Sequence, residues 1–448
     1  MSVEDDIFEE EAESTWERGR TRREALLEAG AAAAFVAGGS SLMRVGTAWA
    51  GVKAPRMSRR LDASPKVNLL HGKTVISDFV TLNREYYKGW HQGARRAVEA
   101  LGGVYKFAVD DQNPQVQIQH FEQQVKQGNK IFFCAAPDPS TIAPIAKLAR
   151  DNQAYFDMYF EMPPWGSPFD PRVNGSPYFV TWVAPDWRAQ GDAEMTELAK
   201  VMGGKGNMIW ITGFPGSTPD LELSAGIKQA LKRYPNIKVI GSQPGNWLQA
   251  DSRAAMAGFI RKFGDKIDGI IGQNDDCGIG AAQAYNEAGI KKIPPIVSTN
   301  GATLTIEYIL RGQYHGTLAT YPAWNGGAAA VRVIDAYLGW KPTVPERMMW
   351  TGGAMITKEN AAGYLKFVSG PDPFNWPLMS RIAHPKDWDP QAPFYPLNFS
   401  QWWSVTPQPK GFVYPPEIAQ SVKSGEFARI SALYKAHYKR KIYGDKSA

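Results

Sequence analysis

The chain has 448 residues, of which 44% are hydrophobic and 21% are charged. This length fits two or more domains rather than one small core, and the mixed charge excludes disorder along the whole chain. The formal net charge is +6, but Lys and Arg are not dense before residues 434–441, so nucleic acid is not an expected partner.

The first fifty residues predict an export signal. Arg22 and Arg23 precede a mildly apolar stretch at 29–39, and the small residues at 48–50, AWA, suit a cleavage site. This pattern resembles a twin-arginine signal peptide, and its apolar stretch is too short to span a membrane. The expected product is a soluble periplasmic protein without a lipid anchor, because no cysteine lies near the cleavage site.

A disordered tail followed by an ordinary amphipathic helix is the alternative for this region. Glu24 and Glu28 lie inside the motif, and Arg44 lies between the apolar stretch and the cleavage site.

The cysteines and histidines point to no metal site. Cys134 and Cys277 are far apart and are expected to be two buried free thiols. The six histidines are scattered without an HExxH pair, so we expect no metal and no cofactor.

Strand and helix patterns alternate after the signal. Apolar runs at 73–80, 104–110, 130–136 and 154–160 predict buried strands. The first intervening helix ends at a double glycine, and its apolar face consists of Trp90, Ala94, Ala97, Val98 and Leu101. The second helical pattern carries Ile118, Phe121 and Val125 on one face. The third helical pattern spans 139–152.

The same alternation recurs in the second part of the chain. Strands are predicted at 178–184, 207–213, 237–243, 268–274, 293–301 and 314–322. The helices that follow them are predicted at 187–202, 220–233, 250–263, 275–289, 303–312 and 326–339. This order implies βαβ units with helices on both faces of parallel sheets, so the predicted fold class is α/β with two doubly wound parallel-sheet lobes.

The expected domain limits follow from these patterns. After the signal at 1–50, lobe 1 comprises 66–176 and 321–350, and lobe 2 comprises 177–320. The chain is expected to cross between lobes near 163–178, 320–323 and 345–352.

The C-terminal extension at 351–448 has a different composition. Most of it is rich in proline and aromatic residues and lacks a period, which favours an extended arm packed on the body over free disorder. A basic helix is expected at 416–440.

Three stretches are similar to one known family. They are TVISDFVTLNREYYKGWHQGARRAVEALGG at 74–103, GQNDDCGIGAAQAYNEAG at 272–289 and IVSTNGATLTIEYILRGQYHGTLATYP at 296–322. Together they resemble ribose-type periplasmic sugar-binding proteins, the solute receptors of bacterial ABC importers. The resemblance runs from about residue 73 to 340 and implies a type I periplasmic-binding-protein fold with a ligand between the lobes.

The resemblance also implies ligand-binding residues. Tyr86 and Tyr87 stand where the family has two phenylalanines that sandwich the sugar ring, and Trp247 stands at a stacking position of the second lobe. The polar positions implied are Asn83, Arg84, Asn274 and, beside it, Asp275. Core packing is the alternative for the tyrosines, surface or hinge packing for Trp247, and helix capping for Asn274 and Asp275.

Departures from the family pattern argue against ribose. Asn300 and Thr320 replace a family aspartate and glutamine, and Leu221 replaces an arginine, so the charged pair that grips pentose hydroxyls is missing. Either Tyr159 or Glu161, or neither, takes the place of the aspartate after the fourth strand.

The predicted function is a monomeric solute receptor that closes on a sugar or polyol and delivers it to an ABC permease of the inner membrane. A non-sugar ligand, such as an aromatic, furanosyl or amino-acid-like compound, is the main alternative. An enzyme is not expected, because GxSxG, P-loop and GxGxxG motifs are missing. A sugar-responsive repressor is not expected either. It would need a helix-turn-helix within the first fifty residues, and that region is acidic and then apolar.

Overall fold

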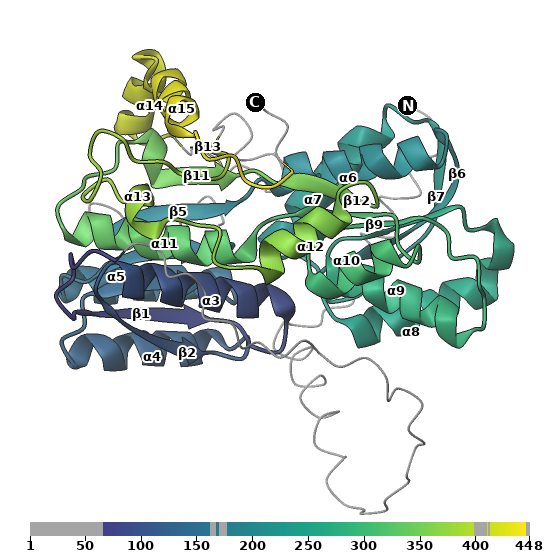
Figure 1. Cartoon of the computed structure of the whole chain (residues 1–448), viewed down its shortest axis with the longest axis horizontal. Helices are drawn as coiled ribbons and strands as arrows, with labels where there is room; N and C mark the ends of the chain where they lie inside the picture. Colours follow the sequence, from purple (N-terminus) through teal and green to yellow (C-terminus); the bar gives the residue numbers. More distant parts are fainter. Residues whose placement is uncertain (1–65, 162–166, 170–176, 398–409, 411–412, 445–448) are drawn as a thin grey trace, which may run out of the picture. The chain divides into compact units, whose positions relative to one another are not determined.

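The computed structural model describes residues 66–161, 167–169, 177–397, 410 and 413–444. The expected export signal at 1–50 lies outside these ranges. The described residues form two α/β lobes, each built on its own sheet (Figure 1). This confirms the predicted fold class of two parallel-sheet lobes.

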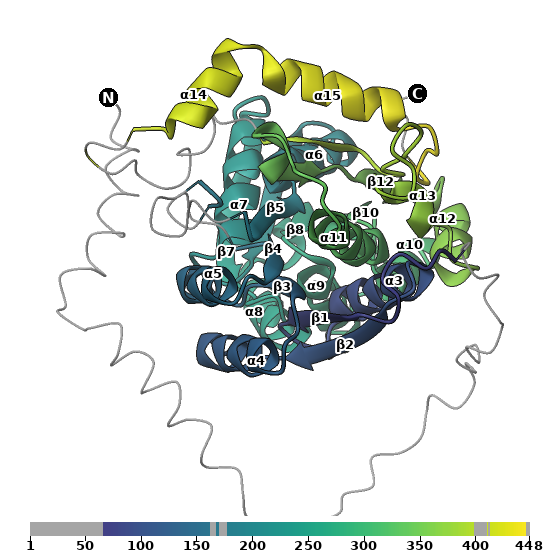
Figure 2. The same ribbon diagram turned by 90° about the vertical axis from the view of Figure 1, so that its left-hand side faces the viewer.

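The first sheet has the strand order β13-β11-β5-β4-β3-β1-β2, and only β13 is antiparallel to its neighbour. Helices α3 and α11 cover one face, and α4 and α5 cover the other (Figure 2). The strands are β1 (Thr74–Phe79), β2 (Val104–Val109), β3 (Ile131–Ala135), β4 (Tyr155–Tyr159), β5 (Phe179–Pro185), β11 (Met348–Thr351) and β13 (Phe394–Pro396). The helices are α3 (Glu85–Ala100), α4 (Pro114–Lys126), α5 (Ile142–Asp151) and α11 (Pro322–Tyr337).

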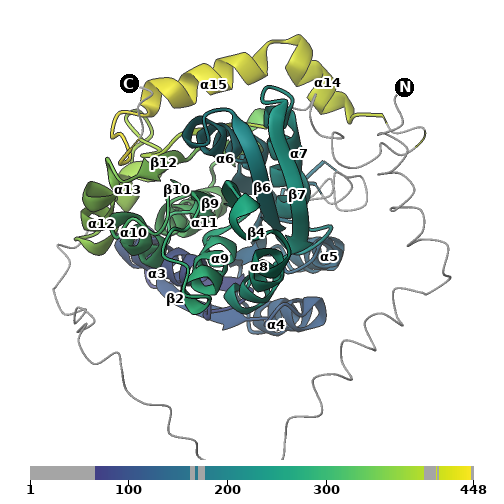
Figure 3. The same cartoon turned by 90° about the vertical axis from the view of Figure 1, so that its right-hand side faces the viewer.

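The second sheet has the order β12-β10-β9-β8-β6-β7, with β12 antiparallel to β10. Helices α6 and α7 lie on one face, and α8 and α9 lie on the other (Figure 3). The strands are β6 (Lys205–Thr212), β7 (Asn236–Pro244), β8 (Gly269–Gly272), β9 (Ile296–Asn300), β10 (Gly316–Ala319) and β12 (Ala354–Thr357). The helices are α6 (Trp187–Val201), α7 (Thr218–Leu231), α8 (Gln249–Phe263), α9 (Asp275–Glu287) and α10 (Thr303–Leu310).

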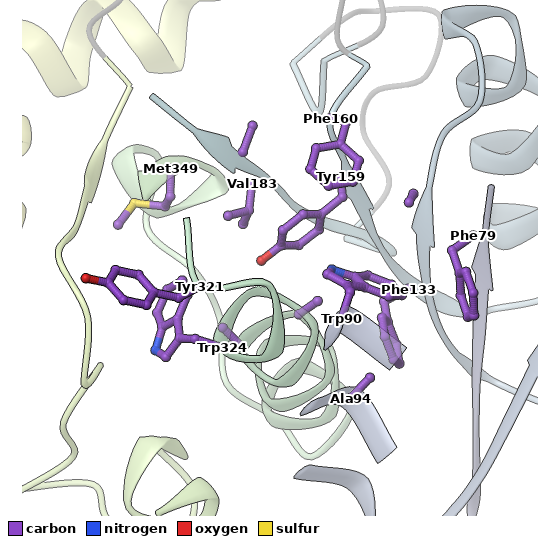
Figure 4. Packing of buried hydrophobic residues seen from close by; sticks show 14 of the residues in the cluster. Phe79, Trp90, Ala94, Phe133, Tyr159, Phe160, Val183, Tyr321, Trp324 and Met349 are labelled. Atoms are coloured by element: carbon purple, nitrogen blue, oxygen red, sulfur yellow. The ribbon is translucent and has the colours of Figure 1, made fainter. Parts of the chain in front are cut away.

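Aromatic rings fill the core of the first lobe (Figure 4). Trp90 of α3 is fully buried, with its ring 5.2 Å from that of Phe133 and 5.6 Å from that of Phe79. Helices α3 and α11 approach closely at two glycines, because a Cβ on Gly93 or Gly326 would lie within 2.0 Å of a carbonyl oxygen of the other helix. The predicted helix face of α3 is therefore the one that packs inward.

The sheets correct the expected lobe limits. The sequence pattern predicts β5 in the second lobe, but β5 pairs with β4 and β11 in the first sheet. The chain therefore does not change sheets near 163–178; it does so at 185–187, between β5 and α6. Later changes occur at 319–322, at 351–354 and between β12 and β13. A run of apolar residues predicts a strand but does not say which sheet the strand joins.

The extension contributes to both sheets, because it contains β12 and β13. Its buried rings include Trp376, Trp388 and Phe394, as expected for an arm packed on the body. The expected helix at 416–440 is two helices separated at Ser424–Gly425, where Gly425 has a φ of 70°. The other helices of the extension are α12 (Ala361–Ser369), α13 (Trp376–Met379), α14 (Pro416–Lys423) and α15 (Glu426–His437).

Two further observations complete the fold. Cys134 and Cys277 are both buried and free, as predicted. Among the described residues, no helix has the length and apolar character needed to cross a membrane.

Asp157 makes the stability of the fold dependent on pH. Its side chain on β4 is fully buried, and Oδ1 accepts the N–H of Thr181 at 3.1 Å. Burial raises the pKa of Asp157 to about 7, although Arg332 attracts its charge. Because the folded pKa lies above the ordinary value, the carboxyl contributes stability that is complete below about pH 4 and is lost as the pH rises through about 7.

We expect Asp157→Asn to abolish this loss, because the amide keeps the acceptor for Thr181 and cannot ionise. Denaturant unfolding should give variant and parent similar free energies near pH 4 and a variant more stable by about 1–3 kcal/mol near pH 8. Asp265→Asn, at an exposed carboxyl, is the control. A variant that follows the parent at both pH values would contradict the raised pKa.

Candidate functional site

A cavity of about 130 Å³ lies where the carboxyl ends of strands from the two sheets face each other. This is the edge at which open α/β sheets bind ligands. A wider vestibule of about 400 Å³ adjoins it and shares Arg84, Gln112, Trp247 and Asp276 with it. All lining residues of both spaces precede residue 301, so the described part of the extension does not line them.

Three rings of the first lobe form one wall of the cavity. Tyr86 lies edge-on to Tyr87 and to Phe160, with ring centroids 5.6 Å apart in each case. The hydroxyl of Tyr86 accepts a hydrogen bond from Asn325 at 3.2 Å. Burial raises the pKa of both tyrosines, so both stay neutral. The wall is apolar with uncharged polar tips.

Trp247 supplies a ring from the second lobe, and a glycine makes room for it. A Cβ on Gly213 would lie 1.9 Å from the indole, so the ring lies directly over the end of β6. Trp247 itself has a φ of 61°. The indole contacts both the cavity and the vestibule.

Backbone strain is concentrated at the cavity. Four lining residues other than glycine have positive φ, namely Gln112, Phe160, Trp247 and Asn300. Such conformations cost about 1–3 kcal/mol and persist where the surroundings enforce them, often at binding sites.

Amide side chains line the second-lobe side. Asn274 is the N-cap of α9, and its Oδ1 accepts the N–H of Cys277 at 2.8 Å. Gln273 accepts the N–H of Gly213 and donates to Ser224 at 2.9 Å. Asn300 is the last residue of β9 and also lines the cavity. Capping and cavity contact are therefore compatible at Asn274.

Charged and polar groups gather at the vestibule. Arg84 lines both spaces, Asn83 lines the vestibule, and Asp276 accepts a hydrogen bond from Gln249 at 2.7 Å. Burial raises the pKa of Asp276, while Arg84 opposes this shift.

Two candidates lie behind the cavity wall rather than in it. Asp275 is buried, and its carboxylate accepts from Ser298, from Thr317 at 2.6 Å and from the N–H of Ala302 at 2.5 Å. Burial raises its pKa to about 7, and these hydrogen bonds lower it. Thr320 is also buried, and its hydroxyl donates to the carbonyl of Asn300 at 3.4 Å. Both support the wall from behind.

Several lining residues were not among the sequence candidates. They include Gln112, Phe160, Trp187, Phe214, Gln273 and Asp276. Each lies within four residues after the end of a strand, and this position was the available signal. Of the two residues considered after the fourth strand, Glu161 lines the cavity, whereas Tyr159 is fully buried in the core.

Glu161 bonds to the opposite lobe. Its Oε2 accepts the N–H of Thr218 at 3.0 Å and the hydroxyl of Thr218 at 2.9 Å. Burial raises the pKa of Glu161 to about 7, the bonds from Thr218 lower it, and Asp138 and Asp220 raise it further.

Comparison with known proteins identifies the family. Residues 79–342 match the periplasmic binding protein domain. The chain belongs to this family. The resemblance recognised in the sequence is thereby confirmed.

Individual relatives agree with this assignment. The xylitol-binding protein of Mycolicibacterium smegmatis is 38% identical over 135 residues, which cover 30% of this chain and 38% of that protein. The galactofuranose-binding protein YtfQ of Escherichia coli is 27% identical over 284 residues, covering 61% and 85%. The chain thus spans little more than a third of the first relative and most of the second. Both are named as binding proteins, which supports a non-enzyme at the level of the family.

Solved structures show the same fold. A twin-arginine translocation pathway signal protein from Burkholderia phytofirmans superposes with a TM-score of 0.63 at 24% identity, covering 68% of this chain and 95% of that one. A galactofuranose-binding protein gives 0.58 at 23% identity, covering 66% and 97%.

We expect Gly213→Ala to displace the indole of Trp247, because the added methyl group would overlap it. In protein labelled with 5-fluorotryptophan, the ¹⁹F resonance of Trp247, assigned with Trp247→Phe, should shift. Gly258→Ala is the control, since only Arg261 comes within 4.0 Å of a Cβ there. An unmoved resonance in Gly213→Ala would refute the close packing.

Proposed function

We propose that this chain is a periplasmic solute receptor that binds a sugar or polyol in the cleft and delivers it to an ABC import permease by hinge closure. The observation that carries the proposal is the cavity itself, with rings and amides contributed by both lobes at the carboxyl ends of their strands. Relatives named for xylitol and galactofuranose support the ligand class.

The cavity suits the two kinds of surface that a sugar presents. Tyr86, Phe160 and Trp247 can cover apolar C–H faces, and each aromatic side chain can bury about 150–250 Å². Amides such as Asn274 and Asn300 both donate to and accept from hydroxyls without adding charge. Micromolar binding needs about 8 kcal/mol, which stacking and several hydrogen bonds can supply.

Hinge closure is supported by the chain path. The polypeptide changes sheets through short connections at 185–187, 319–322 and 351–354, and once more along the longer path from β12 to β13. Ligand contacts to both lobes would favour the closed form over the open one. We further propose that the receptor acts as a monomer.

Export by the twin-arginine route is part of the proposal. The Arg22–Arg23 pair and the small residues at 48–50 support a signal at 1–50. The similarity to a protein named for the twin-arginine pathway is consistent with this route.

A non-sugar ligand is the second candidate. It is favoured by the number of aromatic residues at the cavity, namely Tyr86, Tyr87, Phe160, Trp187, Phe214 and Trp247. An aromatic or furanosyl compound would use the same walls with fewer hydroxyl contacts.

Ligand identification tests the function directly. We expect native mass spectrometry of gently purified protein, or calorimetry with xylitol, D-apiose, L-arabinose, D-ribose, D-allose, D-fructose and myo-inositol, to reveal one neutral polyhydroxy ligand. A bound aromatic or amino-acid-like mass would support the second candidate. Absence of any small-molecule binding by well-folded protein would refute the receptor proposal.

We expect Tyr87→Ala and Trp247→Ala each to weaken binding of the ligand so identified at least tenfold, which is about 1.4 kcal/mol, because each removes one stacking surface. Isothermal titration calorimetry measures the change. Tyr234→Ala, beyond the far end of α7, is the control and should leave the affinity unchanged. Unchanged affinity in both cavity variants would exclude the rings from the site.

A further inference from the structure

Two carboxylates of the first lobe contact the N-termini of two helices of the second lobe. Glu161, after β4, accepts the N–H of Thr218, the first residue of α7, at 3.0 Å. Glu85, in the first turn of α3, accepts the N–H of Thr303, the first residue of α10, at 2.5 Å. The same type of contact therefore occurs twice between the lobes.

Neither helix is capped by the side chain of its own N-cap residue. The N-cap residues are Ser217 for α7 and Ala302 for α10, and neither makes a side-chain cap hydrogen bond. The first N–H groups of a helix have no partner within the helix and attract negative charge or an acceptor oxygen. Each helix thus obtains this acceptor from the opposite lobe.

The two contacts occupy different places. Glu161 is buried and lines the cavity, whereas Glu85 is exposed and does not line it. At Glu161, burial raises the pKa to about 7, so its contribution comes from accepting hydrogen bonds rather than from full charge. Separation of the lobes would break both contacts, because a hydrogen bond does not tolerate a gap of several ångströms.

We propose that Glu85 and Glu161 are closure residues, which stabilise the closed receptor by capping α10 and α7 across the cleft. This inference rests on the proposed hinge closure. Any free energy that favours the closed form raises the apparent affinity for the ligand. Part of the ligand affinity would therefore come from Glu85 and Glu161, which act between the lobes.

The test measures closure without ligand. Spin labels are placed at Lys126→Cys on α4 and Arg253→Cys on α8, both at exposed side chains, while the native cysteines are buried. Electron–electron double resonance then gives the interlobe distance distribution of the ligand-free chain. We expect a short-distance population in the parent and a loss of at least fivefold in its ratio to the long-distance population in the Glu85→Ala/Glu161→Ala double variant.

Matched variants separate capping from general damage. Glu85→Gln/Glu161→Gln keeps the acceptor oxygens and should retain at least half of the short-distance population. Glu99→Ala, on the same helix α3 but paired with Arg95 of its own helix at 2.7 Å, should behave as the parent. Thr303→Pro removes the donor from the second lobe, and proline is well tolerated at the first position of a helix. It should therefore reproduce the effect of Glu85→Ala alone.

Two results would overturn the inference: a parent without a short-distance population, or equal distributions in the parent and the alanine double variant. Ligand binding is a separate readout. A chain that binds none of the tested compounds but closes in a Glu85- and Glu161-dependent manner would refute the sugar proposal alone. A chain that binds a sugar and closes regardless of both residues would refute this inference alone.

Discussion

The structure depends on one constraint, which is that the parallel strands of both sheets end toward the same space. At that edge a helix follows the strand, so backbone N–H donors, helix N-termini and the side chains of the first helical turn converge on the cavity. Tyr86 and Tyr87 follow β1, Trp247 follows β7, and Asn274 follows β8. The side chains at the strand–helix junctions therefore determine the composition of the cavity.

Sequence reasoning recovered nearly all the elements up to α11, because buried parallel strands form continuous apolar runs and their helices repeat at a period near 3.6. It failed where that signal is weak or non-local. Strands β11, β12 and β13 lie in or next to the extension, where the regular alternation of strand and helix patterns ends and no longer marks a short strand. The placement of β5 depends on pairing with β4 and β11, which no local stretch encodes.

At the site, too, sequence reasoning predicted some features and missed others. The resemblance pointed to positions after strands, and Tyr86, Tyr87, Trp247, Asn274 and Asn300 do line the cavity. The resemblance does not tell which of two consecutive side chains at the start of a helix points into the cavity. Successive residues of a helix point about 100° apart, so Asp276 lines the cavity while Asp275 supports it from inside.

Helix capping connects this geometry to the two-lobe organisation. Helices α6 and α9 are capped by their own Asp186 and Asn274, and these caps persist whatever the position of the other lobe. In α7 and α10 the acceptors for the N–H groups of the first residues, Thr218 and Thr303, come from the first lobe, so opening returns those two N–H groups to water. Because water also satisfies them, the net gain on closure is small, on the order of 1 kcal/mol for each contact. A gain of that size biases the hinge without closing it permanently, which leaves the ligand to decide the equilibrium.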